Sequence, residues 1–461
     1  MNFAVLVDFG STYTKMTCID LTKRKVVVMD KCPSTVLIDA SLGLHRCFET
    51  AKAAIGPHNL ASSLKLATSS AAGGLRMAVV GLTKSVSNIA GRNASFSAGA
   101  KIVYSAAGLL SETEVAAIEA ADAEILLLCG GYEGGNFKGL LHNAEMLCES
   151  KLSIPVIFAG NSFLSQDIRR RFTSKGKECF LAENIIPAIG SLNIAPTAEI
   201  IRNLFMKRIT NMKGVGIVQQ EMNEAIVPTP AAVLSAGELL SVGTDRQAGI
   251  GPLMMVDIGG ATTDIYSYIQ NSSYQGAKCI GAPEPYAKRT VEGDMGMRES
   301  SSCLLKEVGK ESFSIKCGVS EETLEAAINR RITVKSYLSD SDLEKRIDYN
   351  IACAAVSISA RRHAGYVTKE FNDGCRFVQY GKNLTEIKTI VGTGGIIVNE
   401  SKAFDILETV KAEMTESGHR LLPETVDIFV DKDYVLFAAG LLRKYDEDAA
   451  LAIIKQSLRL A

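Results

Sequence analysis

A polar stretch near the start of the chain combines a carboxylate, a glycine, several hydroxyls and a lysine, which are groups that bind phosphate and metal ions. It reads Asp8-Phe9-Gly10-Ser11-Thr12-Tyr13-Thr14-Lys15. Gly10 allows backbone N–H groups to approach an anion, the hydroxyls are further donors, and Lys15 can place a positive charge over a phosphate. Asp8 ends an apolar run, where a carboxylate is costly unless it is paired or faces a cation. By itself this pattern is most often only a turn.

The same kind of stretch occurs a second time, and a glycine turn follows later in the chain. The second copy is Asp257-Ile258-Gly259-Gly260-Ala261-Thr262-Thr263-Asp264, and the glycine turn is Gly392-Thr393-Gly394-Gly395. Asp264 holds the place that Lys15 holds in the first copy, so it cannot duplicate a lysine's contact with phosphate. Three such turns in this order favour a nucleotide held between two lobes over three unrelated turns.

Apolar runs on both sides of each aspartate identify the elements that must position these turns. Residues 3–7 and 16–19 flank the first copy, and residues 254–256 and 265–269 flank the second. Two β-type runs joined by a short polar segment predict a β-hairpin. The sequence therefore predicts one hairpin in each half of the chain, and a further strand at 387–391 that ends at the glycine turn.

Residues from about 100 to 215 follow a different pattern. A helix capped by Ser111 precedes a buried strand at 125–129, and a second strand at 155–159 is followed by a basic helix. Repeated strand–loop–helix units predict a parallel α/β segment. The glycine loops after these strands are either a second ligand site or only the places where the chain turns.

Two further helices are predicted next to the second hairpin. Thr229 begins the first of them, with Pro230 at its first position. The sequence Glu292-Gly293-Asp294 precedes the second, which is expected to carry Arg298.

Composition and motifs exclude several classes of protein. Over 461 residues, 50 Lys and Arg nearly cancel 51 Asp and Glu, which gives no surface for nucleic acid or an anionic membrane. No apolar run approaches the roughly 20 residues that span a bilayer, and no signal peptide is expected. The 11 cysteines are scattered without a Cys-x-x-Cys pair, which favours a reducing cytoplasm. Dinucleotide-binding, P-loop and Asp-x-His-x-x-Gly cobalamin motifs are missing from the sequence.

The order of the three turns resembles the phosphate-1, phosphate-2 and adenosine motifs of the actin, Hsp70 and sugar-kinase superfamily. The chain more closely resembles the MutL (GlmL) family, whose members are accessory proteins of adenosylcobalamin-dependent glutamate mutase. The fragments that carry this resemblance are the first turn, Ser69-Ser70-Ala71-Ala72-Gly73-Gly74-Leu75-Arg76-Met77, Val227-Pro228-Thr229-Pro230 and Val291-Glu292-Gly293-Asp294-Met295-Gly296-Met297-Arg298.

The resemblance implies a two-lobed, ribonuclease H-like α/β ATPase fold. Residues 1–240 would form the N-terminal lobe with the phosphate-1 hairpin, and about 100–215 would be an inserted α/β segment within it. Residues 241–461 would form the C-terminal lobe with the phosphate-2 hairpin and the adenosine turn.

A role for each candidate residue follows from this resemblance. Asp8 and Asp257 would hold Mg²⁺, mostly through water, and one of them would orient the attacking water. Lys15 would offset the developing charge, and Asp264 would contact water or the metal. Glu292 and Arg298 would either line the adenosine pocket or pair with each other. The remaining candidates are the donors to the β- and γ-phosphates, Gly10, Ser11, Thr12, Gly259, Gly260, Thr262 and Thr263, and the glycines next to the adenosine and α-phosphate, Gly392, Gly394 and Gly395.

The function expected from this resemblance is a slow ATPase that assembles, protects or reactivates an adenosylcobalamin-dependent mutase in the cytoplasm. The segment at 100–215 is the candidate partner surface. Two alternatives remain open, a small-molecule kinase of the same superfamily and an actin-like filament protein. A kinase would need a base and a pocket for a hydroxyl substrate, and neither is identifiable in the sequence.

Overall fold

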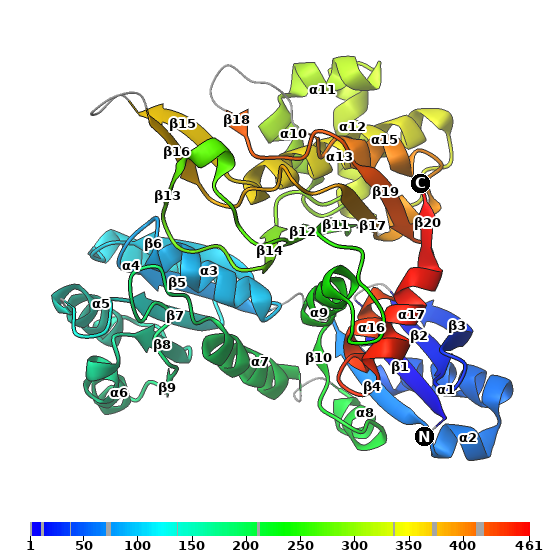
Figure 1. Ribbon diagram of the computed structural model, residues 1–461, viewed down its shortest axis with the longest axis horizontal. Coiled ribbons are helices and arrows are strands. Elements are labelled where there is room, and N and C mark those ends of the chain that lie inside the picture. The colour runs from blue at the N-terminus through cyan, green and yellow to red at the C-terminus, as the bar shows by residue number, and fades with distance from the viewer. Residues whose placement is uncertain are drawn as a thin grey trace. The chain divides into compact units, whose positions relative to one another are not determined.

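The computed structural model describes residues 2–10, 13–36, 38–70, 75–135, 137–209, 213–334, 337–370, 376–411 and 419–461. The chain forms two compact units (Figure 1). The first unit is Met1–Val233 with Ile280–Pro285, and the second is Leu234–Cys279 with Tyr286–Ala461. In the described part of the chain, no helix combines the length and the apolar character that a bilayer crossing requires.

The first sheet of unit 1 carries the Asp8 hairpin. β1 (Phe3–Phe9), β2 (Tyr13–Asp20) and β3 (Lys25–Pro33) form an antiparallel meander. β4 (Leu64–Ser69) lies parallel to β1, and β10 (Val227–Pro228) lies parallel to β4. The strand order is therefore β10-β4-β1-β2-β3. The helices of this part are α1 (Ala40–Ile55), α2 (Pro57–Ala61) and α8 (Val215–Glu221).

The main sheet of unit 2 repeats this arrangement around the Asp257 hairpin. β11 (Leu253–Ile258), β12 (Thr263–Tyr268) and β14 (Ala287–Glu292) are antiparallel neighbours. β17 (Thr389–Thr393) lies parallel to β11, and β19 (Asp427–Asp431) lies parallel to β17. With β20 (Leu458–Leu460) at the edge, the order is β14-β12-β11-β17-β19-β20. Both hairpins also have the same register, since Asp8 pairs with Lys15 and Asp257 pairs with Asp264.

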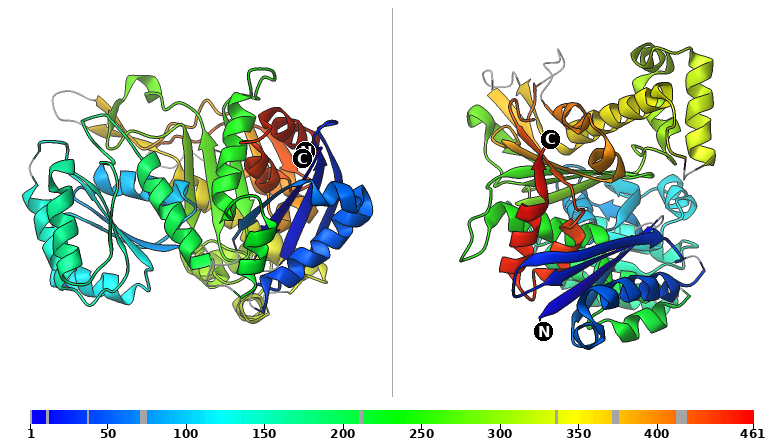
Figure 2. Two further views of the ribbon diagram at one scale, coloured as in Figure 1. Left: turned by 90° about the horizontal axis from the view of Figure 1, so that it is seen from below. Right: turned by 90° about the vertical axis from the view of Figure 1, so that its right-hand side faces the viewer.

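A parallel sheet in unit 1 has the strand–helix alternation that the sequence predicts for residues from about 100 to 215, but the sheet begins earlier, at Arg76. Its strands are β5 (Arg76–Gly81), β6 (Lys101–Ala107), β7 (Ile125–Gly130), β8 (Val156–Gly160) and β9 (Cys179–Leu181), in the order β6-β5-β7-β8-β9. Helices pack on both faces (Figure 2, left). α3 (Ser87–Ser97) and α7 (Ala195–Ile209) contribute to one core, and α4 (Glu112–Ala120), α5 (Lys138–Glu149) and α6 (Ser165–Ser174) to the other. Ser111 caps α4 with a capping box, as predicted.

A layer of helices packs on the main sheet of unit 2. It consists of α10 (Ser301–Val308), α11 (Lys310–Cys317), α12 (Glu321–Thr333) and α13 (Asp342–His363), which share one apolar core with the sheet. The remaining helices are α9 (Thr229–Val242), α14 (Gly395–Asn399), α15 (Ala403–Glu408), α16 (Leu436–Leu442) and α17 (Glu447–Ser457). A small second sheet has the order β13-β16-β15-β18, with bounds Lys278–Ile280, Arg376–Tyr380, Tyr366–Glu370 and His419–Arg420. Two 3-10 turns cover Ser162–Leu164 and Tyr274–Gly276.

Candidate functional site

The turn of the first hairpin is held by its own backbone. The Gly10 N–H donates to the Tyr13 carbonyl at 3.0 Å, and the Ser34 hydroxyl donates to the Gly10 carbonyl at 2.7 Å. A Cβ atom at position 10 would lie 2.7 Å from the Tyr13 carbonyl oxygen, so only glycine fits this turn. Lys15 is half-buried in the strand opposite Asp8. The predicted phosphate donors Ser11 and Thr12 lie outside the described residues.

Asp8 is buried and oriented by two threonines that sequence reasoning did not place in the site. Its side chain is only 3% exposed. Its Oδ1 accepts a hydrogen bond from Thr229 Oγ1 at 2.6 Å and another from Thr68 Oγ1 at 2.9 Å. Thr68 is the neighbour of Asp8 in the β1–β4 register. The only sequence signal for either residue was the Val-Pro-Thr-Pro fragment around Thr229.

The turn of the second hairpin has the same backbone geometry as the first. The Gly259 N–H donates to the Thr262 carbonyl at 2.8 Å, which matches the bond between Gly10 and Tyr13. Asp257 is partly buried at the end of β11. Each unit therefore presents an aspartate at the end of a central strand, followed by a turn closed by the same hydrogen bond.

Asp264 is engaged in an ion pair inside unit 2. Its Oδ1 accepts from Arg289 Nε at 2.8 Å, and its Oδ2 accepts from the Thr262 hydroxyl at 3.2 Å. Burial lowers the pKa of the Arg289 guanidinium, but the charges and hydrogen bonds of Asp264 and Tyr266 together raise it more, so the net pKa is above its ordinary value. A metal ion would have to compete with Arg289 for Asp264. The metal contact of Asp264 therefore stays a prediction.

The segment Met295–Ser300 clamps the second turn. The backbone N–H of Met297 donates to the Gly259 carbonyl at 3.1 Å, and that of Arg298 donates to the Gly260 carbonyl at 2.7 Å. The Ser300 hydroxyl adds a bond to the Ala261 carbonyl at 2.7 Å. Arg298 lies in this loop, because α10 begins only at Ser301. A helix does follow Glu292-Gly293-Asp294, but the prediction that it carries Arg298 is wrong. The N–H groups of Met297 and Arg298 and the hydroxyl of Ser300 are instead bonded to the carbonyls of the second turn.

The side chain of Arg298 points into a buried cluster of charges. Its Nη1 and Nη2 donate to the two carboxylate oxygens of Asp348 at 3.0 and 3.3 Å. Asp348 also accepts from Arg331 Nε at 2.8 Å, and Arg331 pairs with Glu344 at 2.7 Å. Burial raises the pKa of the Asp348 carboxyl, but Arg298 and Arg331 lower it more, and the net pKa is below its ordinary value.

Glu292 accepts from a different arginine. Arg362 on α13 donates to its carboxylate at 2.9 Å and also contacts Asp294. The ion-pair partners Asp348, for Arg298, and Arg362, for Glu292, both lie on α13. Their predicted roles at the adenosine stay predictions.

The glycine turn lies directly against the second hairpin. Gly394 has φ +97°, and a Cβ atom there would lie 2.4 Å from the Ile258 carbonyl oxygen and 3.0 Å from Asp257 Oδ1. A Cβ atom at Gly392 would meet Leu407 Cδ1 at 2.4 Å, so this glycine serves core packing. Gly395 begins α14 with open space beside it. The structure therefore brings Asp257 and the glycine turn together within unit 2.

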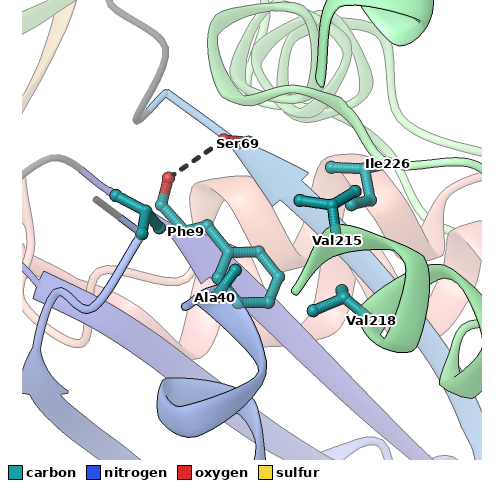
Figure 3. Close-up of a pocket in the computed structure, with 7 residues that line it drawn as sticks. Phe9, Ala40, Ser69, Val215, Val218 and Ile226 are labelled. Atoms are coloured by element: carbon teal, nitrogen blue, oxygen red, sulfur yellow. Dashed lines mark hydrogen bonds between the residues drawn. The ribbon is translucent and has the colours of Figure 1, made fainter. Parts of the chain in front are cut away.

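A small cavity lies behind the first turn (Figure 3). It measures about 10 Å³, and its lining is apolar except for Ser69, whose hydroxyl donates to the Phe9 carbonyl at 3.3 Å. Such a volume has room for about one water molecule. It belongs to the packing beneath the hairpin and is too small for a nucleotide. Among the residues that the structure describes, no group of three or more His, Cys, Asp or Glu side chains has the arrangement of a metal site.

The duplicated sheet, with an Asp-x-Gly turn (Asp8–Gly10 and Asp257–Gly259) at the same place in each copy, defines the ribonuclease H-like fold of the actin, Hsp70 and sugar-kinase superfamily. The predicted fold class is thus confirmed. The chain matches the model of a family described as MutL protein over residues 4–458. It is also 35% identical over 460 residues to Protein MutL of Clostridium tetanomorphum, with 99% of each chain covered. The chain therefore belongs to the MutL family, as its fragments indicated.

Solved structures with related architecture have little sequence in common with this chain. The activator of the 2-hydroxyisocaproyl-CoA dehydratase from Clostridium difficile with bound ADPNP is 9% identical, with a TM-score of 0.32 and 99% of this chain and 95% of that chain covered. Xylulose kinase from Bifidobacterium adolescentis is 12% identical, with a TM-score of 0.32 and coverages of 99% and 93%. Because these scores are low, the strand order within each unit is what defines the fold.

Proposed function

We propose that this protein binds Mg-ATP at its two Asp-Gly turns and hydrolyses it slowly in the service of a partner enzyme. The observation that carries the proposal is the repetition of one site element. Asp8 and Asp257 stand at the same register position of two hairpins that have the same turn bond. A β-hairpin with a glycine turn offers backbone N–H donors to phosphate, and its aspartate offers a ligand to Mg²⁺.

The chain's own residues would orient the reacting groups. Thr68 and Thr229 hold the Asp8 carboxylate in one orientation, ready to accept from a water of hydrated Mg²⁺. The Met295–Ser300 clamp and Gly394 hold the second turn and Asp257. Mg²⁺, when bound, would neutralise charge on the phosphates. Phosphoryl transfer depends mainly on such positioning and charge neutralisation, so no covalent nucleophile is required.

We propose that the partner is an adenosylcobalamin-dependent mutase of the glutamate mutase type, which this protein assembles, protects or reactivates. The proposal is supported by membership of the MutL family. The partner would dock on unit 1, at the loops that follow the strands of the parallel sheet. In the described part of the segment from about 100 to 215, the exposed large apolar side chains all lie on these loops. We call them the carboxyl-edge patch, which consists of Leu109, Tyr132, Phe137, Phe163 and Ile189.

Buried amide side chains hold the loops of this patch in place. Asn143 bonds to the Gly108 carbonyl and the Leu110 N–H, and Asn161 donates to the Tyr132 carbonyl. Exposed aromatic residues on an ordered surface are typical of the centre of a protein interface. A surface that is ordered before binding also loses less entropy on association.

Nucleotide binding is tested by thermal unfolding with Mg-ATP. A ligand present at about 100 times its Kd stabilises the folded state by about 2.7 kcal/mol, so the melting temperature should rise. ATP with a chelator should give a smaller rise. The absence of a shift with every purine nucleotide would remove the nucleotide site.

The partner is tested with a glutamate mutase that has been inactivated by turnover. Added protein with ATP and fresh adenosylcobalamin should restore activity, and ADP should not. Phe163→Ser and Ile189→Ser should weaken association with the mutase, whereas Phe377→Ser, which replaces an exposed phenylalanine on β16, is the matched control. Equal recovery without nucleotide, or no association in any nucleotide state, would reject the mutase as partner.

A further inference from the structure

The first residues of α9 lie where three parts of the chain meet. β10 pairs with β4 so that Val227 is beside Thr68, and α9 begins at the next residue after β10, Thr229. This pairing brings the Thr229 hydroxyl to 2.6 Å from Asp8 Oδ1, although the two residues are 221 positions apart in the chain. The start of α9 is therefore attached to the carboxylate of the first turn.

The same segment also packs against the parallel sheet's part of unit 1. Gly99 lies between α3 and β6, and a Cβ atom there would be 2.6 Å from Pro228 Cβ and 3.8 Å from the Ala231 nitrogen. Gly99 has φ +87°, which is a further reason for glycine at this position. Only glycine leaves room for Pro228 at this position, so the residue pair that leads into α9 packs closely on the backbone of Gly99.

At its other end, α9 continues out of unit 1. The division between the two units falls after Val233, within the helix. A helix is a stiff element, since each residue is tied to the next turn by backbone hydrogen bonds. Thr229 and the first residues of unit 2 are therefore joined by one continuous helix.

We propose that Thr229 is the positioning residue that couples the nucleotide state at Asp8 to α9. This inference rests on the proposed function, because it requires Asp8 to respond to ATP. When ATP is bound, the metal at its γ-phosphate attracts the Asp8 carboxylate and displaces it. The hydrogen bond between Asp8 and Thr229 transmits this displacement to the first turn of α9 and to Gly99. After hydrolysis, the carboxylate returns and the helix start returns with it. Such a coupling is reciprocal, so a partner that fixes the parallel-sheet segment changes nucleotide affinity by the same factor.

Thr68 provides a matched control for this role. Its hydroxyl donates to the same Oδ1 at 2.9 Å, but Thr68 belongs to β4 and not to α9. Thr68→Val and Thr229→Val each remove one hydrogen bond to a charged acceptor and keep the side-chain shape. Each should slow ATP hydrolysis by about tenfold. Only Thr229→Val should remove the coupling, and Thr229→Ser should retain it.

The experiment compares amide hydrogen exchange of residues 227–242 in the full chain with Mg-ATP and with Mg-ADP. The wild type and Thr68→Val should show different protection of this segment in the two nucleotides, and Thr229→Val should show the same protection in both. The inference is overturned if Thr229→Val keeps the difference, if Thr68→Val loses it equally, or if the wild type binds both nucleotides without any difference. Failure of the wild type to bind either nucleotide would overturn the proposed function itself.

Discussion

Replacing Arg298 with methionine tests whether the buried charge cluster fixes the second turn. In the wild type, the guanidinium makes two bonds to Asp348 and one each to the carbonyls of Met297 and Tyr337. The side chains of Arg298 and Asp348 are only 14% and 7% exposed. Methionine keeps much of the packing volume but leaves Asp348 with one cation fewer.

The expected loss of stability can be estimated from this geometry. Breaking a buried ion pair by removing one partner costs about 3–5 kcal/mol. Arg331 and Ser339 still donate to Asp348 in the variant, so the lower end, about 3 kcal/mol, applies. At about 2–4 °C per kcal/mol for a domain of this size, the transition of unit 2 should fall by about 6–12 °C.

The assay is calorimetric unfolding of the variant beside a matched control. Arg330→Met removes an arginine of α12, next to Arg331, and the side chain of Arg330 is 52% exposed in its ion pair with Glu344. Exposed pairs contribute about 0–1 kcal/mol, so this control should change little. The double variant Arg298→Met with Asp348→Asn should recover part of the loss, because it removes the buried negative charge that has lost one of its two arginine partners. A loss below about 1 kcal/mol for Arg298→Met would refute the reasoning.

The same cluster predicts a dependence on pH. The pKa of Asp348 is below its ordinary value in the folded protein, and an unfolded aspartate titrates near 3.9. The stabilisation is therefore fully present above the unfolded pKa and is lost as the pH falls through the folded pKa. In Arg298→Met the pKa of Asp348 rises, so acid unfolding should begin at a higher pH than in the wild type.

Three further predictions concern the site and unit 2. Asp8→Asn and Asp257→Asn should each slow ATP hydrolysis by about 10²-fold or more while circular dichroism stays unchanged, and near-normal turnover in both would reject the site. Gly394→Ala should weaken nucleotide binding in a titration, because its φ of +97° and the nearby Asp257 carboxylate leave no room for a methyl group. Gly395→Ala is the control in that titration, because Gly395 lies beside open space. Burial and two nearby lysines hold the pKa of His363 well below its ordinary value, so His363 stays neutral when folded. Unfolded histidine binds a proton near pH 6.5, so unit 2 should lose stability as the pH falls below about 6.5, and His363→Gln should flatten that slope in thermal unfolding.

The local elements of the site were predictable from the sequence. Both hairpins, their Asp-Gly turns and the capping of α4 by Ser111 follow from residues within a few positions of one another. The N–H groups of Gly10 and Gly259 close the two turns, and the residue type alone identifies these positions as turns. The repetition of the turn indicated one hairpin in each half of the chain, and the resemblance to the superfamily implied the two-lobed fold.

Side-chain partners were decided only by the tertiary structure. Arg298 meets Asp348 from 50 positions away, and Thr229 reaches Asp8 from 221 positions away. Asp264 was expected to contact water or the metal, and only the strand pairing of β12 with β14 shows that Arg289 lies beside it. Turns and caps are set by neighbouring residues through backbone geometry, which a sequence displays directly. The partner of a buried charge is set by which distant elements pack together, and the pairs are then selected by the need to neutralise charge away from water. No local pattern contains that information.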